Sequence, residues 1–352
     1  MKDILTGKLS RCKFVGAMIC IILALVACGK AENEEPAVSL KATALATSSP
    51  VLNTSTPFPP ATDTPIPSPS STPSFTPTYT PTLTPTQTPE LPIRFAVIGD
   101  YGLEGKAEED VANLVLSWSP DFIITTGDNN YPDGSAKTID DNIGQYYHSF
   151  IYPYSGKYGE GADINRFFPT IGNHDWKTDG GKPYLDYFTL PGNERYYDFI
   201  WGPVHFFAIN SDSNEPDGIR RSSSQAAWLQ QSLASSTTPW QIVYTHYAPY
   251  SSGIHGSTDW IQWPFNEWGA DAVLAGHDHT YERLVIDDLV YFVNGVGGGQ
   301  RYMFSEPVEG SMVRFRSDYG AMLVEASRQK IVFQFITRKN ELIDEYTLWA
   351  GR

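Results

Sequence analysis

Short apolar runs recur along residues 93–352, and each has the length of a buried β-strand. Five of these runs end in a turn that carries a polar side chain, usually just after a glycine. These five runs are 93–98, 122–126, 167–171, 240–245 and 271–275. Because ligands of open α/β sheets bind outside the carboxyl ends of the strands, the repeated arrangement predicts a functional site built from several segments.

Helical patterns separate several of the runs. Apolar residues recur at helical spacing from Val111 to Trp118, and Pro120 ends the pattern because proline cannot continue a helix. Ser222 and Gln225 have the spacing of a capping box at the start of a second helix. Strands that alternate with helices favour a largely parallel sheet in this part of the chain.

The last part of the chain has a different pattern. Four apolar runs follow one another closely, at 289–294, 321–326, 331–336 and 342–348, and predict strands joined by hairpins. The fold class predicted for residues 93–352 is therefore α/β, with two packed mixed β-sheets flanked by helices.

Proline divides the chain into regions of different character. Half of the 26 prolines lie between Pro50 and Pro92, and from Pro69 to Pro89 they recur every four residues, mostly after threonine. A segment with so few apolar side chains cannot form a core, and its composition favours an extended polyproline II spacer. We therefore expect a disordered Pro/Thr/Ser-rich linker at 29–92. Residues 93–352 are then one globular domain, large enough to bury a sizeable core.

The first 28 residues have the pattern of an export signal. Basic residues between Lys2 and Lys13 precede an apolar run at 14–27, which is shorter than the roughly 20 residues that span a bilayer. The run ends in Leu25-Val26-Ala27-Cys28, which resembles the lipobox of bacterial lipoproteins and implies cleavage before Cys28 and a lipid on its thiol. The alternative is an uncleaved membrane anchor. Either version predicts an extracytoplasmic domain held at the bacterial cell membrane.

The net charge of −15 lies entirely in residues 93–352, where 19 basic side chains stand against 34 acidic ones. An acidic domain repels a phosphate backbone, so no nucleic-acid partner is expected. The three cysteines, Cys12, Cys20 and Cys28, all precede this domain, which excludes thiol nucleophiles and thiolate metal sites from it. Catalysis there must use other side chains or a metal.

Five ordered blocks after the strand-like runs carry hard oxygen and nitrogen ligands. They are Gly99-Asp100-Tyr101-Gly102, Gly127-Asp128-Asn129-Asn130-Tyr131, Gly172-Asn173-His174-Asp175, Val243-Tyr244-Thr245-His246 and Gly276-His277-Asp278-His279. Together they resemble the metal-binding motifs of purple acid phosphatases, which belong to the calcineurin-like metallophosphoesterases. The resemblance runs from about residue 93 to residue 300. One such block is a weak signal, whereas five in the family's order are a strong one.

The resemblance implies two metal sites that share one bridging carboxylate, that of Asp128. The ligands of the first site would be Asp100, Asp128, Tyr131 and His279, and those of the second Asp128, Asn173, His246 and His277. Related enzymes of the superfamily carry a histidine two residues after the first aspartate. Gly102 stands at that position here, and the resemblance implies that Tyr131 supplies the replacement ligand.

The chemistry of these ligands indicates which metals they suit. Two carboxylates and a deprotonated phenol around the first metal suit Fe(III) better than a divalent ion. The second set, with two imidazoles, an amide and the shared carboxylate, suits Zn, Mn or Fe(II). In two-metal hydrolysis, ions about 3.5–4 Å apart share a hydroxide that attacks phosphorus, and they stabilise charge on the entering and leaving oxygens.

Two histidines outside the ligand set are candidates for catalytic contacts. His174 follows the ligand Asn173, and Asp175 is available to orient its ring. His255 lies in a loop soon after the ligand His246. The resemblance implies that both histidines contact the substrate or its leaving group.

The sequence therefore predicts a phosphatase that hydrolyses small phosphomonoesters outside the cytoplasm. A phosphodiesterase or nucleotide hydrolase with the same metal site is the alternative, because the motifs do not separate these substrates. A surface binding protein without catalysis is a third hypothesis. The complete ligand set argues against it, since loss of function would be expected to remove at least one ligand.

Overall fold

A computed structural model of the chain describes residues 92–351. The predicted export signal and nearly all of the predicted linker lie outside the described residues. Within 92–351, no helix is both long enough and apolar enough to cross a membrane.

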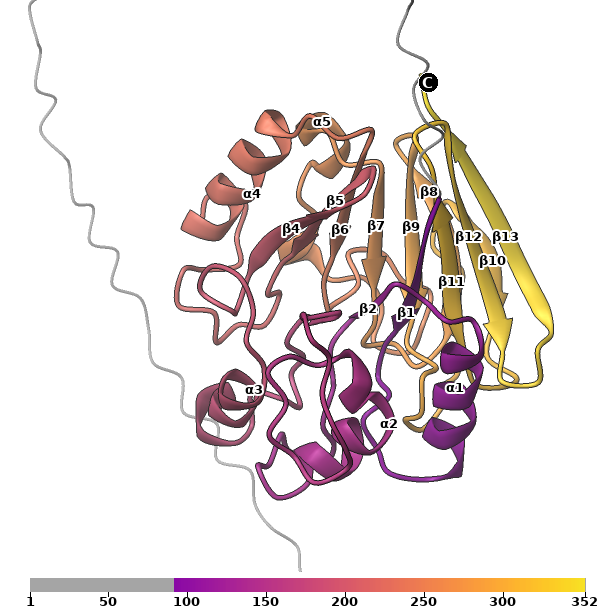
Figure 1. Cartoon of the computed structure of the whole chain (residues 1–352). Coiled ribbons are helices and arrows are strands. Elements are labelled where there is room, and N and C mark those ends of the chain that lie inside the picture. The colour runs from indigo at the N-terminus through magenta and orange to yellow at the C-terminus, as the bar shows by residue number, and fades with distance from the viewer. Residues whose placement is uncertain (1–91, 352) are drawn as a thin grey trace, which may run out of the picture. The chain divides into compact units, whose positions relative to one another are not determined.

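Two mixed β-sheets form the centre of the structure (Figure 1). The first has the order β13-β12-β11-β1-β2-β3, and the second the order β10-β8-β9-β7-β6-β5-β4. The strands of the first sheet are β1 (Ile93–Ile98), β2 (Phe122–Thr125), β3 (Phe167–Pro169), β11 (Gly320–Ala326), β12 (Lys330–Thr337) and β13 (Leu342–Trp349). Those of the second are β4 (Tyr197–Trp201), β5 (Val204–Ala208), β6 (Trp240–Tyr244), β7 (Ala272–Ala275), β8 (Tyr281–Ile286), β9 (Leu289–Asn294) and β10 (Ser311–Phe315).

Parallel pairing dominates where helices separate the strands. In the first sheet β1, β2 and β3 are parallel, and in the second β5, β6, β7 and β9 are parallel. The strands β11, β12 and β13 pair antiparallel, as does the hairpin of β8 and β9. That hairpin turns at Asp287 and Asp288, which both have positive φ angles, as a two-residue hairpin turn requires.

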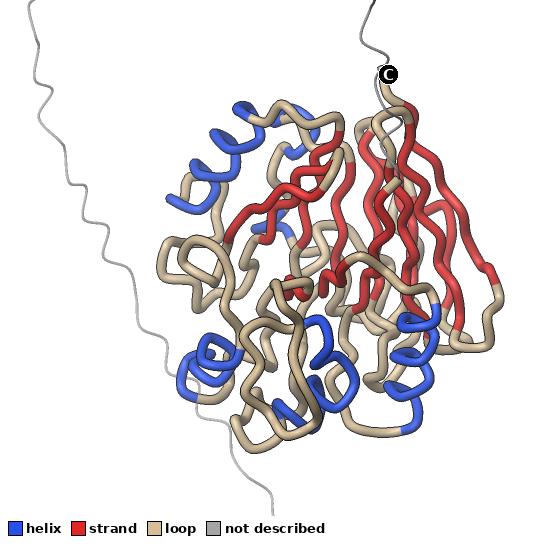
Figure 2. Tube along the Cα trace, in the orientation of Figure 1, coloured by secondary structure: helices blue, strands red, loops and turns tan. Residues whose placement is uncertain are grey.

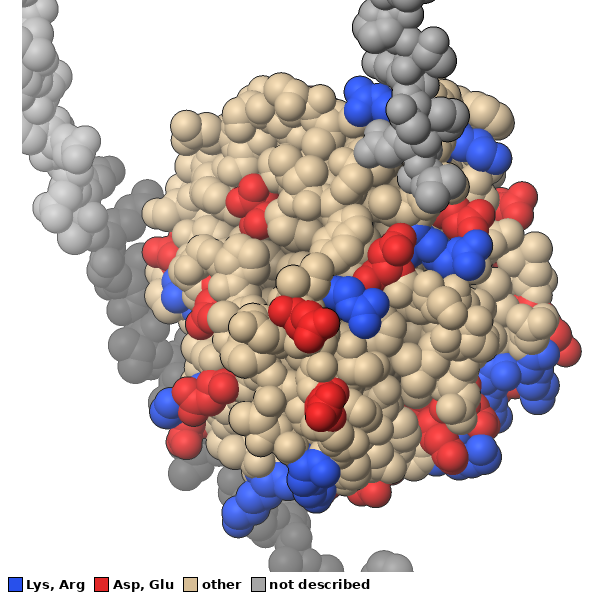
Figure 3. Space-filling model, viewed as in Figure 1, with Lys and Arg blue, Asp and Glu red and all other residues tan. Residues whose placement is uncertain are grey.

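Helices and loops surround the strands (Figure 2). The helices are α1 (Lys106–Ser117), α2 (Gln145–Tyr147), α3 (Lys182–Tyr187), α4 (Ser224–Ser235) and α5 (Phe265–Trp268), with short turns of other helical types at Asp140–Gly144, His148–Phe150, Asp179–Gly181 and Asp259–Ile261. On the face of the molecule in Figure 3, Lys and Arg side chains are interspersed with Asp and Glu, and no continuous basic surface is seen.

Alternation along the strands divides the core into two apolar layers. Phe206 packs against Phe95 at a ring-centroid distance of 5.0 Å, and both belong to the large layer that joins the two sheets. The next residue, Phe207, points the other way, into a second layer that includes α4 and α5 residues such as Leu229 and Phe265. Burial on both faces explains why these strands read as continuous apolar runs.

The predicted fold class, two packed mixed sheets flanked by helices, is confirmed. The predicted strands fall within two residues of the observed ones, and the apolar run at 204–209 likewise contains β5. The strands β4, β8 and β10 were not predicted. The predicted cap of α4 is wrong by one residue, because Ser223 is the N-cap and its hydroxyl accepts a hydrogen bond from the Ala226 amide. Gln225 instead turns inward, where its side chain bonds to the Asn210 backbone.

Candidate metal centre

The first two acidic residues of the site stand at the ends of neighbouring parallel strands. Asp100 follows β1 and Asp128 follows β2, and the Asp100 amide donates to the Gly127 carbonyl at 3.1 Å. Both aspartates have φ angles of 52°, in the left-handed region that most side chains avoid. Backbone strain of this kind is concentrated at functional sites, and here it turns both carboxylates toward the same edge.

Two glycines allow these turns to approach one another. A Cβ at Gly172 would lie 2.2 Å from the Asp128 nitrogen, so only glycine fits between β3 and the Asp128 turn. A Cβ at Gly102 would lie 1.7 Å from the Asn129 oxygen, which leaves no space for a histidine at that position. The Tyr131 amide also donates to the Gly102 carbonyl at 2.8 Å, which holds the tyrosine beside the site.

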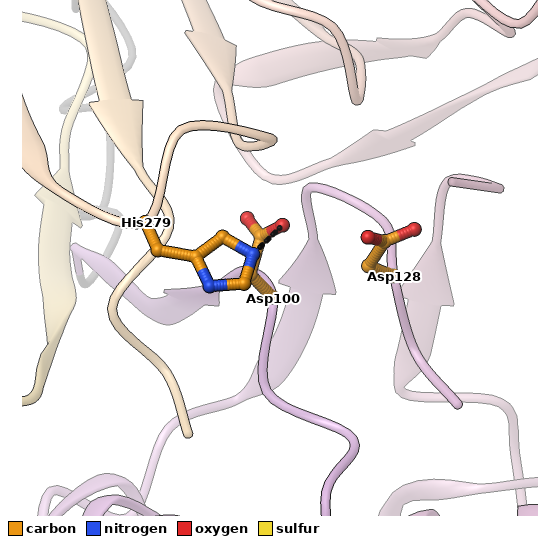
Figure 4. Close-up of side chains that lie close together, drawn as sticks. All are labelled: Asp100, Asp128 and His279. Atoms are coloured by element: carbon orange, nitrogen blue, oxygen red, sulfur yellow. Dashed lines mark ion pairs between the residues drawn. The ribbon is translucent and has the colours of Figure 1, made fainter. Parts of the chain in front are cut away.

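Asp100, Asp128 and His279 point toward one another from three different loops (Figure 4). One ligand atom from each lies within 4.8 Å of the others, the arrangement expected of a metal site. The Tyr131 hydroxyl completes the group: its oxygen is 3.0 Å from Asp128 Oδ2, 3.3 Å from Asp100 Oδ1 and 3.0 Å from His279 Nε2. His279 Nδ1 donates to the Gln300 carbonyl, which leaves Nε2 free to bind a metal. We call this group the tyrosine cluster.

The charges of the tyrosine cluster fit a cation of high charge. The carboxylates of Asp100 and Asp128 are buried, and among the ion pairs of residues 92–351 their partners are histidines. Burial, together with these two carboxylates, raises the pKa of the Tyr131 phenol well above its ordinary value. Burying carboxylates without a cation is costly, and a bound metal would remove that cost and favour ionisation of the phenol.

A second group of ligands lies on the other side of Asp128. His246 Nε2 is 3.4 Å from Asp128 Oδ1, 2.9 Å from Asn173 Oδ1 and 3.3 Å from His277 Nδ1. His246 Nδ1 donates to the Thr126 carbonyl at 2.9 Å, so its Nε2 faces the group as an acceptor. The Asp128 side chain contacts side-chain ligand atoms of both groups, the position required of a bridging ligand. We call this group the histidine cluster.

Burial keeps one imidazole of the histidine cluster neutral. Burial, and then the nearby rings of His246 and His255, lower the pKa of His277 to about 2. Burial acts in the same direction on His246, but the carboxylates of Asp128 and Asp100 outweigh it, so its pKa is raised. A neutral imidazole is the form that binds metals, and a metal would take the place of the proton on His246.

His174 lies at the rim of the site. Its amide donates to Asp128 Oδ1 at 2.8 Å, and its ring Nε2 is 3.9 Å from Asp128 Oδ2. Its Nδ1 is 2.6 Å from the Pro132 carbonyl, and the Lys177 ammonium lies within 3.2 Å of both ring nitrogens. The ring is only partly buried and is therefore accessible to a bound substrate.

His255 lies on the opposite rim, beside the ligand His277. Their ring centroids are 4.5 Å apart. The His255 amide donates to Asp278 Oδ1 at 2.9 Å, and the Ser251 hydroxyl donates to Oδ2 of the same carboxylate. Asp278 thus holds the loop that carries His255.

The structure differs from the predicted role of Asp175. Its buried carboxylate accepts hydrogen bonds from the Gly172 amide, the Asn129 amide and the Asn129 side chain, at 2.8 to 3.2 Å. Within residues 92–351 the hydrogen-bond partners of His174 are Asp128, Pro132 and Lys177, and not Asp175. Burial, and then the Asp128 charge, raise the pKa of Asp175 to about 7. Asp175 fixes the loops of Asp128 and Asn173 rather than the His174 ring.

This position predicts a structural effect for Asp175→Ala. Removing the carboxylate leaves three buried donors unsatisfied, so we expect the free energy of unfolding to fall by on the order of 3 kcal/mol. Chemical denaturation measures this loss, and Asp179→Ala, an exposed change nearby, is the control. Unchanged stability together with lost turnover would favour the predicted orienting role instead.

Two aromatic residues near the ligands were not found by sequence reasoning. Tyr302 stacks on the ligand His279 at 4.1 Å, and Tyr247 lies against His277 at 4.2 Å. Tyr247 directly follows the ligand His246, which is a weak signal of proximity. Tyr302 lies outside the five motif blocks, and only the path of the loop after β9 brings it to the site.

The two-sheet fold with ligands at its strand ends defines a class of metal-dependent hydrolases, and comparison identifies the family. The family model described as calcineurin-like phosphoesterase matches residues 93–281. The chain therefore belongs to the calcineurin-like phosphoesterase family, and the prediction of a metal-dependent phosphoesterase is confirmed at the level of the family.

The chain is also a distant homologue of purple acid phosphatases. It is 28% identical over 254 residues to purple acid phosphatase 15 of Arabidopsis thaliana, which covers 61% of this chain and 47% of that protein. It is 24% identical over 291 residues to purple acid phosphatase 4 of the same plant, covering 69% and 79%. The chain thus spans about half the length of the first relative and most of the second.

Two solved structures share the fold. Purple acid phosphatase PPD1 from yellow lupin seeds has a TM-score of 0.61 at 18% identity, covering 73% of this chain and 54% of that one. GAP50, the anchor in the inner membrane complex of Plasmodium, has a TM-score of 0.60 at 19% identity, covering 75% and 90%. At these identities the likeness concerns the fold alone.

Proposed function

We propose that the chain is a two-metal phosphatase that hydrolyses phosphomonoesters. Purple acid phosphatases are among its relatives, and their name describes phosphatases. The observation that carries the proposal is the Tyr131 hydroxyl, which lies between Asp100, Asp128 and His279. The fold by itself does not decide the function, because GAP50 shares it and is described as an anchor. The ligand geometry supports an enzyme rather than a surface binding protein.

The two clusters would each hold one metal, with Asp128 shared between them. The tyrosine cluster, with its anionic oxygens, is the site for Fe(III), and the histidine cluster, with its two imidazoles and the Asn173 amide, is the site for Zn, Mn or Fe(II). When bound, two such metals activate water as a nucleophile and stabilise charge on the phosphate oxygens. The chain's own residues fix the ligands through the Thr126 and Gln300 carbonyls and position the substrate at the rim.

The two rim histidines would deal with the leaving group. The ring of His174 stands on the Asp128 side and that of His255 on the His277 side, so a bound phosphate ester lies between them. Either imidazole can donate a proton to the departing oxygen, which otherwise leaves as a strongly basic alkoxide.

His174→Ala and His255→Ala are therefore expected to retain metals and to lose turnover by roughly 10²–10⁴-fold. The loss should be smaller for aryl phosphates, because a phenolate needs less protonation than an alkoxide. Metal content and kcat on aryl and alkyl phosphates measure both effects, with the remote His205→Gln as the control. Loss of metal in both variants would place these histidines among the ligands instead.

The substrate preference is tested by comparing 4-nitrophenyl phosphate with bis(4-nitrophenyl) phosphate. We expect the metal-loaded protein to prefer the monoester, and a chelator to abolish hydrolysis of both esters. A preference for the diester would indicate that the same metal site hydrolyses phosphodiesters instead. Absence of hydrolysis with a full metal content would favour the binding protein.

We further propose that the protein is extracytoplasmic and anchored to the bacterial membrane by a lipid on Cys28. The support is the sequence pattern of basic residues, apolar run and lipobox, which lies outside the described residues. In Cys28→Ser the acceptor thiol is gone, so the precursor should remain unprocessed or the protein should leave the membrane fraction. Fractionation with immunoblotting measures this, with Cys20→Ser as the matched control. Normal processing and membrane retention of Cys28→Ser would contradict the anchor.

A further inference from the structure

A cavity beside the metal centre combines cationic and aromatic residues. Its volume is about 560 Å³, and its lining includes Arg220, Arg221, Trp260, Gln262 and Trp263. The arginines come from the loop before α4, and the aromatic residues from the loop that leads to α5. None of these residues belongs to the five motif blocks.

The two loops that form the cavity are fixed to each other. The Trp260 indole donates to the Ser211 carbonyl at 3.1 Å, and the Trp263 indole lies 3.2 Å from the Ile219 carbonyl. The Gln262 side chain donates to the Pro249 carbonyl at 2.9 Å. These bonds use the polar atoms of both indoles within the protein, and because Trp263 is buried, the partly exposed Trp260 ring is the indole surface available to a ligand. The cavity is therefore formed before any ligand binds.

The guanidinium groups of Arg220 and Arg221 have no carboxylate partner among the ion pairs of residues 92–351. Arg195, which contacts the same loop, pairs with Glu215 and Asp217 instead. Asp259 is the acidic residue in the cavity lining, so two cations stand against one anion there. Both arginine side chains are exposed to solvent, and two cations that line one cavity suit an anionic ligand.

Aromatic contacts connect this cavity to the metal ligands. Trp260 contacts Tyr247 at a ring-centroid distance of 5.7 Å, and Tyr247 contacts the ligand His277 at 4.2 Å. The Tyr247 amide donates to the Ser211 hydroxyl at 2.8 Å, which fixes the backbone at this position. The cavity is thus connected to the histidine cluster through two aromatic side chains, those of Trp260 and Tyr247.

We propose that this cavity is a second binding site, which takes the part of the substrate beyond the phosphate that is hydrolysed. The Trp260 ring would stack with a planar ring, and Arg220 and Arg221 would pair with a second anionic group on that ring system. A nucleoside bisphosphate is a compound of this class. The inference rests on the proposed function, because it names the substrate class of the same metal site.

The test is a binding measurement that does not depend on hydrolysis. The probes are adenosine phosphonates in which methylene groups replace the ester oxygens, one with a 5′-phosphonate and one with 3′- and 5′-phosphonates. Calorimetry with the full-length, metal-containing protein should show tighter binding of the bisphosphonate. In Arg220→Ala/Arg221→Ala its affinity should fall roughly tenfold, the loss expected for about one charge-assisted hydrogen bond. The affinity for the monophosphonate should change little.

Two further variants complete the experiment. Trp260→Leu should weaken both probes by roughly tenfold, because each loses ring stacking. Arg328→Ala/Lys330→Ala, which removes the same charge from the exposed turn after β11 and the exposed first residue of β12, should leave both affinities unchanged. Equal affinity of the wild type and the double arginine variant for the bisphosphonate would overturn the inference. Failure of the proposed function is a separate result, namely absence of phosphomonoester hydrolysis by the metal-loaded wild type.

Discussion

Asp128→Asn is expected to reduce phosphomonoester hydrolysis by about 10³-fold or more, since loss of one preorganised charge at a reacting centre costs on this scale. Asp128 is the residue that contacts both clusters, through Tyr131 on one side and His246 on the other. Asparagine keeps the size of the side chain but loses the negative charge and the second oxygen that a bridge requires. We expect the variant to lose at least one metal per chain, measured by mass spectrometry together with kcat.

The same substitution should not lower the free energy of unfolding of the metal-free protein. Asp128 lies near the buried carboxylates of Asp100 and Asp175, and its charge raises the pKa of Asp175. Removing that charge relieves repulsion, so metal-free Asp128→Asn should be at least as stable as the metal-free wild type. Asp186→Asn, an equal change at an exposed ion pair, is the control. Normal metal content and near-normal turnover in Asp128→Asn would overturn the bridging role.

Tyr131→Phe is expected to abolish the visible absorption of the oxidised protein. An unperturbed phenol has a pKa near 10, and burial beside two carboxylates raises the pKa of Tyr131 further, so only a strong Lewis acid can ionise it at working pH. Fe(III) is such an acid, and phenolate-to-iron charge transfer would colour the protein purple to pink. Phenylalanine fills nearly the same space, so the fold should persist while the absorption band disappears.

Tyr302→Phe is the matched control for this experiment. Tyr302 stacks on the ligand His279, but it is not one of the predicted ligands, so its variant should keep the colour. Absorption spectra and metal content of the two variants separate a ligand from a neighbour. A colourless wild type under oxidising conditions, with Tyr131→Phe unchanged in metal content, would indicate a divalent metal in the tyrosine cluster.

Much of the fold was predictable because the strands that carry ligands are buried on both faces. Such strands are continuous apolar runs, and β1 and β9 have the predicted bounds. The missed strands β4 and β10 lie at the edges of the second sheet, and of their residues only Tyr197 is buried, so neither strand is a continuous apolar run. β8 begins two residues after the last motif block, and its polar residues Glu282 and Arg283 interrupt the apolar pattern.

The site was predictable as far as its residues lie in recognisable blocks. Asp100, Asp128, Tyr131 and His279 come together as the resemblance implies, because each follows a strand of one of the two packed sheets. Contacts between loops were not predictable, because they depend on how the loops fold over the strand ends. For this reason the sequence predicted that Asp175 orients His174, whereas Asp175 bonds to the Asn129 loop. Tyr302 and the cavity lined by Arg220 and Arg221 were not predicted.

The most direct test of the account is the number of metals bound per chain. The full-length protein, purified without chelators and supplied with iron and zinc, is analysed by mass spectrometry for metals and protein in the same sample. We expect two metals per chain in the wild type, one of them iron, and fewer than two in Asp128→Asn. One metal or none per chain in a wild-type sample that hydrolyses phosphomonoesters at full rate would contradict the two-metal site.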